Sequence, residues 1–356
     1  MSDREPPTVT GFPSLIELLD LLVDPHTGEH LSAADATTVT VVKLDGSWRP
    51  EIAETRLAAP RSGVLIGIDQ DGEVPEGLGG IFDVLMTSHP CPNREWVSVV
   101  PEALPLEAER LHRRALANPL AASVFARVLR LSERLPFTDG LVLESVGYSA
   151  LLTGAEFRRW REANPPRTRA PNVDTLVTLS RRKHSLRITL NRPHLHNALN
   201  DAMGHQLAEA LRNAAADPAI ERITLDGKGP SFCSGGDLAE FGSATDRPSE
   251  QGIRLAQSVA GMVQDCGDAL SAHIHGACFG AGIEIPAAAR SVVAAPDARF
   301  YLPEVHMGLI PGAGGTVTIR RRIGRHRTAW LGLSGRPLTA MEALAWGLID
   351  GIEAHA

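Results

Sequence analysis

The segment from Gly276 to Glu284 reads GACFGAGIE, and the segment from Leu302 to Gly315 reads LPEVHMGLIPGAGG. Glu284 and Glu304 each stand beside a glycine-rich turn. Because glycine has no Cβ, such turns let backbone N–H groups approach a ligand closely. A turn of this kind at the start of a helix can hold an anion or a developing oxyanion. A nearby carboxylate can then transfer protons beside a polarised carbonyl. The stretch therefore predicts an acid–base site.

Composition narrows the class of protein. The chain has 356 residues, with 43% hydrophobic and 22% charged residues, which is typical of a globular protein of one or two domains. A net charge of −7 argues against a general nucleic-acid or membrane-surface binder. No apolar run approaches the roughly 18–20 residues that span a bilayer, and the N-terminus lacks a secretory signal pattern. We expect a cytoplasmic protein without disulfides or a metal site, because the four cysteines show no CxxC spacing.

The first part of the chain, residues 1–163, is expected to form an additional α/β region that ends in helices. Strands are predicted near residues 38–42, 63–68 and 96–100, with a helix from Ile81 to Thr87. Residues 102–163 show helical periodicity. We find no acid–base pair in this region. A proline-rich segment follows at 164–172 and is predicted to be a linker.

The second part, residues 173–356, alternates strands, glycine turns and helices. Two β-runs within residues 176–190 predict a hairpin, and Asn200 is expected to cap the next helix. A further helix is predicted from Leu255 to Val263. Strands near 220–225, 269–275 and 291–295 complete repeated β-turn-α units, which predict a layered α/β architecture.

Four blocks in this second part resemble the crotonase, or enoyl-CoA hydratase/isomerase, superfamily. They read LNRPHLHNAL (190–199), FCSGGDL (232–238), GACFGAGIE (276–284) and PEVHMGLIPGAGGT (303–316), in the order and spacing of that family. Residues 331–349 are similar to the segment that the family places next. The resemblance implies a crotonase-like ββα spiral core that binds an acyl-CoA thioester.

The resemblance also implies roles for the residues of these blocks. Backbone N–H groups of Gly236 and Ala281 would hold the thioester oxygen, as an oxyanion hole does. Ala281 stands where the family often has glycine, which keeps the N–H donor but adds a methyl group. Glu284 and Glu304 match the two glutamates that hold one water in true hydratases, and Gly312 matches a backbone donor to that water. Facing carboxylates titrate together, so one can act as acid while the other acts as base.

Coenzyme A enters as part of the substrate, so the resemblance implies no separate cofactor. The adenine would pass the backbone of His194, Leu195 and His196, although the family commonly has lysine at the position of His194. The same binding set comprises Ser234, Gly236, Asp237, Leu238, Gly280 and Pro303. The family also implies a homo-oligomer, a trimer or a dimer of trimers.

Several features leave alternatives open. Arg320, Arg321, Arg322, Arg325 and Arg327 are either a phosphate-binding cluster or a solvated helix face. His306 either orients a carboxylate, faces the acyl pocket or packs as a satisfied histidine. Cys233 beside the oxyanion turn is a buried thiol rather than a nucleophile, because no histidine is paired with it.

The chain departs from the family pattern at its C-terminus. Ordinary members continue after the segment matched by 331–349 with helices that close the acyl pocket and build the trimer. Residues 118–166 are similar to that segment in order, although weakly in identity. We therefore expect residues 1–163 to be a degenerate crotonase-like or helical covering region, which supplies this cover within the chain or from a neighbouring chain.

The combined features predict an enoyl-CoA hydratase. An enoyl-CoA isomerase is the nearest alternative, but it needs only one of the two carboxylates. A specialised family member, such as a cofactor-independent oxygenase or a thioester hydrolase, is also open. From a different class, a non-catalytic acyl-CoA-binding scaffold is favoured by Ala281 and by the absent C-terminal segment.

Overall fold

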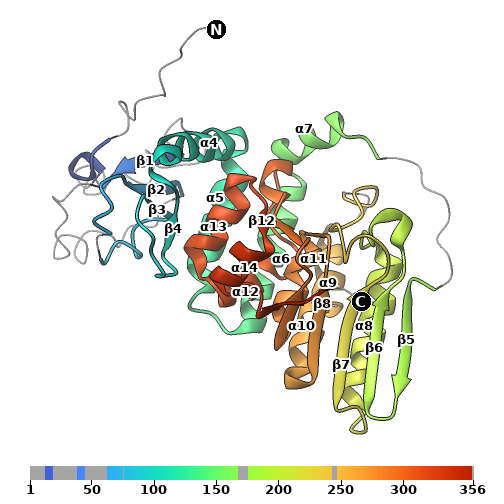
Figure 1. Cartoon of the computed structure of the whole chain (residues 1–356). Coiled ribbons are helices and arrows are strands. Elements are labelled where there is room, and N and C mark those ends of the chain that lie inside the picture. Colours follow the sequence, from blue (N-terminus) through green and yellow to red (C-terminus); the bar gives the residue numbers. More distant parts are fainter. Residues whose placement is uncertain are drawn as a thin grey trace, which may run out of the picture.

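The computed structural model describes residues 13–18, 38–44, 62–74, 76–166, 175–242 and 247–354, without the side chains of residues 247 and 248. Two sheets lie on either side of a central group of helices (Figure 1). The mixed α/β fold agrees with the crotonase-like architecture expected from the sequence. Much of the predicted linker lies outside the described residues.

The N-terminal sheet is a small parallel sheet in which the strands follow chain order. Its strands are nearly all buried, as parallel strands covered on both faces usually are. The helix predicted from Ile81 to Thr87 is wrong, because Val84–Thr87 forms a strand between two others. A short apolar run does not distinguish a buried strand from a buried helix. The strands are β1 (Val39–Lys43), β2 (Val64–Asp69), β3 (Val84–Thr87) and β4 (Trp96–Ser98).

Helices fill most of residues 102–163, as predicted. One of them, α6, buries Gly140, Glu144, Tyr148 and Leu152 at intervals of four residues. This spacing places the four side chains on one face, and that face packs toward the second half of the chain. The elements are η1 (Pro101–Ala103), α4 (Leu104–Ala117), α5 (Pro119–Ser132), α6 (Phe137–Leu152) and α7 (Ala155–Ala163).

The second half contains a six-stranded sheet in the order β13-β10-β8-β7-β6-β5. The predicted hairpin is confirmed, because β5 and β6 pair antiparallel while the other neighbours pair parallel. A second, three-stranded sheet has the order β12-β11-β9. The strands are β5 (Val177–Arg182), β6 (Ser185–Leu190), β7 (Arg222–Gly227), β8 (Leu270–Ile274), β9 (Ala277–Phe279), β10 (Ser291–Ala294), β11 (Arg299–Tyr301), β12 (Leu338–Thr339) and β13 (Gly351–Ile352).

Two helix starts in this half test predictions made from the sequence. Asn200 caps α8 as predicted, and its side chain accepts a hydrogen bond from Met203 N at 3.0 Å. The single helix predicted from Leu255 to Val263 is wrong. Two helices meet there, because Ser258 caps the second by accepting from Gly261 N at 3.2 Å. The helices are α8 (Asp201–Ala216), α9 (Arg247–Ala256), α10 (Val259–Asp265), α11 (Ala281–Glu284), α12 (Gly315–Ile323), α13 (Arg325–Ser334) and α14 (Ala340–Trp346), and the short 3-10 turns are η2 (Pro193–Leu195), η3 (Gly267–Ala269), η4 (Pro286–Ala288) and η5 (Glu304–Met307).

Helix α13 joins the two halves through buried arginines. Arg325 donates to the carbonyl of Phe82 at 3.0 Å, and Arg327 donates to the carbonyl of Trp96 at 3.1 Å. For these two arginines both sequence interpretations are wrong, because they are neither solvated nor arranged around a phosphate. Their guanidinium groups are buried against backbone carbonyls beside the N-terminal sheet. One hydrophobic core then runs through both halves of the chain.

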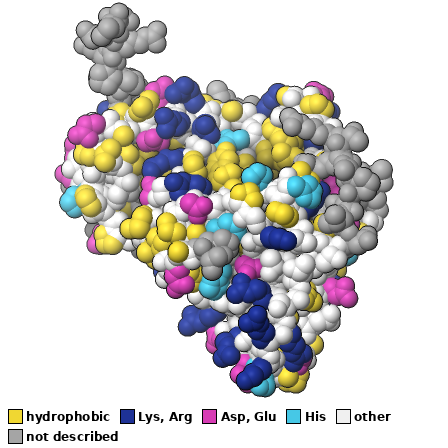
Figure 2. Space-filling model, turned by 45° about the vertical axis from the view of Figure 1, so that its right-hand side comes forward, with side chains coloured by type: hydrophobic (Ala, Val, Ile, Leu, Met, Phe, Trp, Pro, Cys, Tyr) yellow, Lys and Arg dark blue, Asp and Glu magenta, His cyan; other side chains and the backbone are white. Residues whose placement is uncertain are grey.

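The molecular surface is strongly basic at one end. Figure 2 shows Lys and Arg side chains gathered over the lower end of the molecule, where the β5–β6 hairpin lies. Arg181, Arg182 and Lys183 are exposed there. Charged side chains along an edge strand oppose pairing with another chain. No helix within the described ranges has both the length and the apolar character that crossing a membrane would require.

Candidate active site

Two turns are brought together where β9 ends. Cys233 and the β9 residues lie side by side, with Cys233 N donating to Ala277 O at 3.2 Å and Phe279 N donating to Cys233 O at 3.1 Å. The following turn pairs with Leu199 through Gly235 O and Asp237 N, both at 2.8 Å. The N–H of Gly236 therefore lies outside this pairing.

The second turn contains Gly280 and Ala281. Gly280 has φ of 49°, a left-handed conformation that favours glycine. Ala281 is the first residue of α11, so its N–H has no partner within that helix. The first turn touches the strand that leads into the second, because a Cβ added to Gly235 would lie 3.1 Å from Phe279 O. The two predicted oxyanion donors, Gly236 and Ala281, thus stand on adjoining turns.

Glu284 and Glu304 converge on Gly280. They are only 2% and 8% exposed. A methyl group at Gly280 would collide with Glu304 Oε1, and Glu284 Oε1 would lie 3.7 Å from it. Oε2 of Glu304 is buried and has no hydrogen-bond partner among the described residues. The structure therefore brings together the two carboxylates that the sequence singled out.

The two carboxylates differ in their hydrogen bonds. Glu284 Oε2 accepts from Ala313 N at 2.8 Å and from Gly315 N at 2.9 Å, which leaves Oε1 toward Gly280. Burial raises the pKa of Glu284 to about 7, although these two N–H groups favour the charged form. Burial and the neighbouring Glu284 raise the pKa of Glu304 well above its usual value. Such a pair can hold a proton on one member near neutral pH.

Gly312, the predicted water-binding donor, lies in the loop before α12, where that loop contacts helix α6. A Cβ at this position would come within 2.7 Å of the Tyr148 ring. Glycine is therefore required for the close approach of the loop to α6. Gly312 also lies at the edge of a cavity, so its backbone is accessible from that side.

A third buried carboxylate, Glu144, was not predicted from the sequence. Its Oε1 accepts from Gly314 N at 2.7 Å, and its Oε2 accepts from the N–H of Thr316 at 2.8 Å and from the hydroxyl at 2.7 Å. Burial, and next the charge of Glu284, raise the pKa of Glu144 to about 8. An acidic residue on the apolar face of α6 was the one available signal, and it did not indicate which loop Glu144 contacts.

Helices α5 to α7 lie against the loop that carries Glu304 and Gly312. The amide of Asn118 donates to Val305 O at 3.0 Å. A Cβ at Gly308 would lie 2.5 Å from the backbone N of Phe157. Helices from the first half of the chain therefore pack against this loop from within the same chain.

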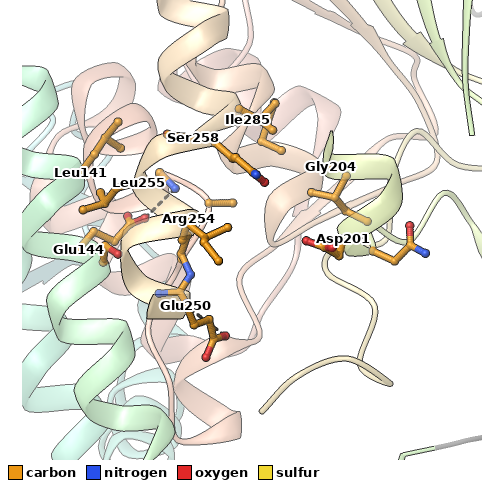
Figure 3. Close-up of a pocket in the computed structure, with 18 residues that line it drawn as sticks. Leu141, Glu144, Asp201, Gly204, Glu250, Arg254, Leu255, Ser258 and Ile285 are labelled. Carbon is orange, nitrogen blue, oxygen red and sulfur yellow. Dashed lines mark hydrogen bonds and ion pairs between the residues drawn. The ribbon is translucent and has the colours of Figure 1, made fainter. Parts of the chain in front are cut away.

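A cavity of about 280 Å³ opens beside Gly312–Gly314. Arg254 on α9 lies 4.4 Å from the centroid of the Tyr148 ring, donates to Ser149 Oγ at 3.0 Å and pairs with Glu250 at 3.1 Å. Figure 3 shows Arg254 and Glu250 facing the cavity beside Glu144. The apolar part of the wall comprises Leu141, Leu199, Ile253, Leu255, Val259 and Ile285.

The predicted coenzyme A residues His194–His196 and Ser234–Leu238 lie on two segments that a backbone hydrogen bond joins. His194 and His196 are exposed, Leu195 is half-buried, and Leu238 is 46% exposed. The N–H of Ser234 donates to His196 O at 3.0 Å. Asp237 is buried and paired with Arg192 at 2.7 Å, so its side chain is structural. Pro303 directly precedes Glu304 at the start of η5.

His306 and Cys233 lie near the site, and the surroundings of both favour a packing role. His306 Nε2 lies 3.3 Å from Arg114 Nη1, and burial together with this arginine lowers the pKa of His306 to about 4. This environment fits the packed histidine among the three interpretations. Burial raises the pKa of the Cys233 thiol to about 11, which opposes a thiolate nucleophile.

Comparisons with known proteins find relatives for the second half of the chain. A sequence model of the family described as Enoyl-CoA hydratase/isomerase matches residues 181–356. The 2,3-dehydroadipyl-CoA hydratase of Escherichia coli (strain K12) is 35% identical over 176 residues, which cover 49% of this chain and 68% of the relative. A probable enoyl-CoA hydratase of Mycobacterium tuberculosis (strain ATCC 25618 / H37Rv) is 33% identical over 172 residues, covering 48% of this chain and 67% of the relative. The crystal structure of enoyl-CoA hydratase from Thermoplasma volcanium GSS1 shares 31% identity, with 51% of this chain and 73% of that chain covered and a TM-score of 0.48.

Proposed function

The chain belongs to the enoyl-CoA hydratase/isomerase family, and from this premise we propose that it adds water across the double bond of a 2-enoyl-CoA thioester. One observation carries the proposal: Glu284 and Glu304 converge on Gly280, beside the turns of Gly236 and Ala281. Both carboxylates are needed for hydration, whereas an isomerase needs only one. The reaction would use no cofactor beyond the coenzyme A of the substrate.

The different hydrogen bonds of the two glutamates suggest different roles. Two backbone N–H groups favour the ionised form of Glu284, which suits a base that takes a proton from water. Oε2 of Glu304 has no such donor among the described residues, and burial together with Glu284 raises the pKa of Glu304 well above its usual value, which suits the acid. The water oxygen would bond to Cβ while the π electrons move toward the thioester oxygen. Glu304 would then protonate Cα as the carbonyl re-forms.

Backbone donors would stabilise the negative charge that develops on the thioester oxygen. The N–H groups of Gly236 and Ala281 are expected to bind it, and each good donor typically contributes about 3–4 kcal/mol to transition-state stabilisation. Coenzyme A would run along the segments from His194 to His196 and from Ser234 to Leu238. We also propose a homotrimer or a dimer of trimers, which light scattering of the purified protein would test.

Turnover of crotonyl-CoA tests the proposed function. Hydration removes the conjugated alkene, so the ultraviolet absorbance of the enoyl thioester should fall and 3-hydroxybutyryl-CoA should appear. A 3-enoyl-CoA supplied in parallel tests isomerisation. If only the 3-enoyl thioester is converted, the protein is an isomerase and the proposed hydratase function is wrong. Tight binding of crotonyl-CoA without either conversion would favour the acyl-CoA-binding scaffold instead.

A further inference from the structure

The loop that runs into the first turn of α12, residues 313–316, is held between two buried carboxylates that come from different halves of the chain. Glu284 accepts from the N–H groups of Ala313 and Gly315. Glu144 accepts from the N–H groups of Gly314 and Thr316. Four consecutive N–H groups therefore alternate between the two glutamates. Neither carboxylate alone could fix the orientation of all four peptide groups.

We propose that Glu144 is a positioning residue, which holds this loop so that Ala313 and Gly315 orient the carboxylate of Glu284. The inference rests on the proposed function, since it assigns how the base of that reaction is aimed. Three donors at 2.7–2.8 Å bind Glu144, and its side chain is 2% exposed. A carboxylate bound this closely can limit the movement of the loop.

Placing a further carboxylate, Glu144, near Glu284 and Glu304 has an electrostatic cost. Two buried carboxylates repel each other, and burial itself disfavours their charged forms. An uncharged side chain that only filled the space beside α12 would avoid this cost. Glu144 supplies what such a side chain lacks, which is two acceptor oxygens that can serve Gly314 and Thr316 together.

Glu156 provides a matched control within the same part of the chain. Its two oxygens accept from Leu120 N at 2.8 Å and Ala121 N at 2.9 Å at the start of α5. It is 9% exposed, so it resembles Glu144 in burial and in bonding to a helix start. It contacts neither Ala313 nor Gly315 through these bonds. A loss of helix capping alone should therefore affect E144Q and E156Q alike.

Steady-state kinetics with crotonyl-CoA separate the two roles. In E144Q the amide NH2 opposes one of the backbone donors, so we expect kcat to fall about 10- to 100-fold, as for other residues that orient a reacting group. KM should stay close to that of the wild type, because no bond to the substrate is lost. E156Q should keep its kcat, although both variants lose thermal stability. Thr316→Val, which retains both backbone bonds to Glu144, should lose little kcat.

Amide hydrogen exchange resolved by NMR gives a readout that needs no turnover. The N–H groups of Ala313 and Gly315 bond to Glu284 and not to Glu144. Faster exchange at these two positions in E144Q, but not in E156Q, would show that Glu144 orders the loop around Glu284. If the wild type fails to hydrate crotonyl-CoA, the proposed function fails while this exchange test still applies.

Two outcomes would overturn the inference. One is a kcat for E144Q that equals that of E156Q. The other is unchanged exchange at Ala313 and Gly315. If E144Q does not fold, E144D replaces it, because Asp keeps the charge but withdraws the oxygens by one methylene. E144D is expected to have a kcat below the wild-type value. A wild-type kcat together with unchanged exchange at Ala313 and Gly315 would also overturn the inference.

Discussion

The two halves of this chain contribute to the site in opposite ways. The second half carries Glu284 and Glu304 beside glycine-rich turns, within motifs that are contiguous in the sequence. The first half has no recognisable acid–base motif, yet α6 places Glu144 and Tyr148 against the same loop. The proposed reactive groups lie in contiguous motifs, whereas the residues that support them come from distant parts of the sequence. If the two halves act as one unit, changes in either half should affect the same reaction and the same unfolding transition.

Removing either of the two carboxylates proposed to react should have the largest effect. Glu284→Gln and Glu304→Gln each keep the size of the side chain but remove its acid–base function. Hydration of crotonyl-CoA should slow by about 10²–10⁴-fold, the usual loss for a general acid or base. Asp268→Asn is a suitable control, because the Asp268 side chain is 94% exposed. Near-normal rates in both Gln variants would contradict the assignment of the pair.

Truncating the aromatic ring that joins the halves should destabilise the whole protein. Phe125 on α5 is fully buried and packs directly on Gly332 of α13. Phe125→Ala should lower the free energy of unfolding by about 3–5 kcal/mol. Calorimetry should still show one transition, because the core is shared.

Leu131→Ala on the same helix is the control for this change. Its side chain is 55% exposed, so the free energy of unfolding should change by about 0.5 kcal/mol or less. Two separate transitions in Phe125→Ala, with only the earlier one shifted, would mean that the first half unfolds independently. The shared core would then not couple the two halves.

Filling the space between the carboxylates should slow the reaction. A methyl group at Gly280 collides with Glu304, and the residue also has a positive φ. A misplacement of about 1 Å can reduce a rate about 10²-fold, and we expect Gly280→Ala to lose kcat/KM by about that factor. In Gly252→Ala on α9, the added methyl group has no described atom within 4 Å. That control should keep its rate, so equal rates in both variants would contradict the geometry.

The sequence predicted Glu284, Glu304 and their turns because these residues belong to contiguous motifs. It also predicted the Asn200 cap and the β5–β6 hairpin, whose signals are local. It failed at Val84–Thr87, where burial inside a parallel sheet and not periodicity decides the structure. It missed Glu144 because the hydrogen bond to Gly314 joins residues 170 positions apart. Arg325 and Arg327 were misread because their carbonyl partners lie in the other half of the chain.

A smaller effect is expected on the pH dependence of stability. Burial raises the pKa of Glu284 to about 7 and that of Glu144 to about 8, from 4.5. The folded protein therefore binds more protons than the unfolded chain between those values. Its free energy of unfolding should fall as the pH rises from 4.5 through about 8. Urea unfolding at several pH values should show a flatter dependence in Glu284→Gln than in the wild type, and an equal slope would contradict the raised pKa.

Hydration of crotonyl-CoA in deuterium oxide tests the central claim most directly. Water would add at Cβ while Glu304 delivers a solvent-derived proton to Cα. Mass spectrometry of the wild-type reaction should therefore show 3-hydroxybutyryl-CoA with deuterium at Cα. Recovery of crotonyl-CoA without deuterium or added water would contradict the account.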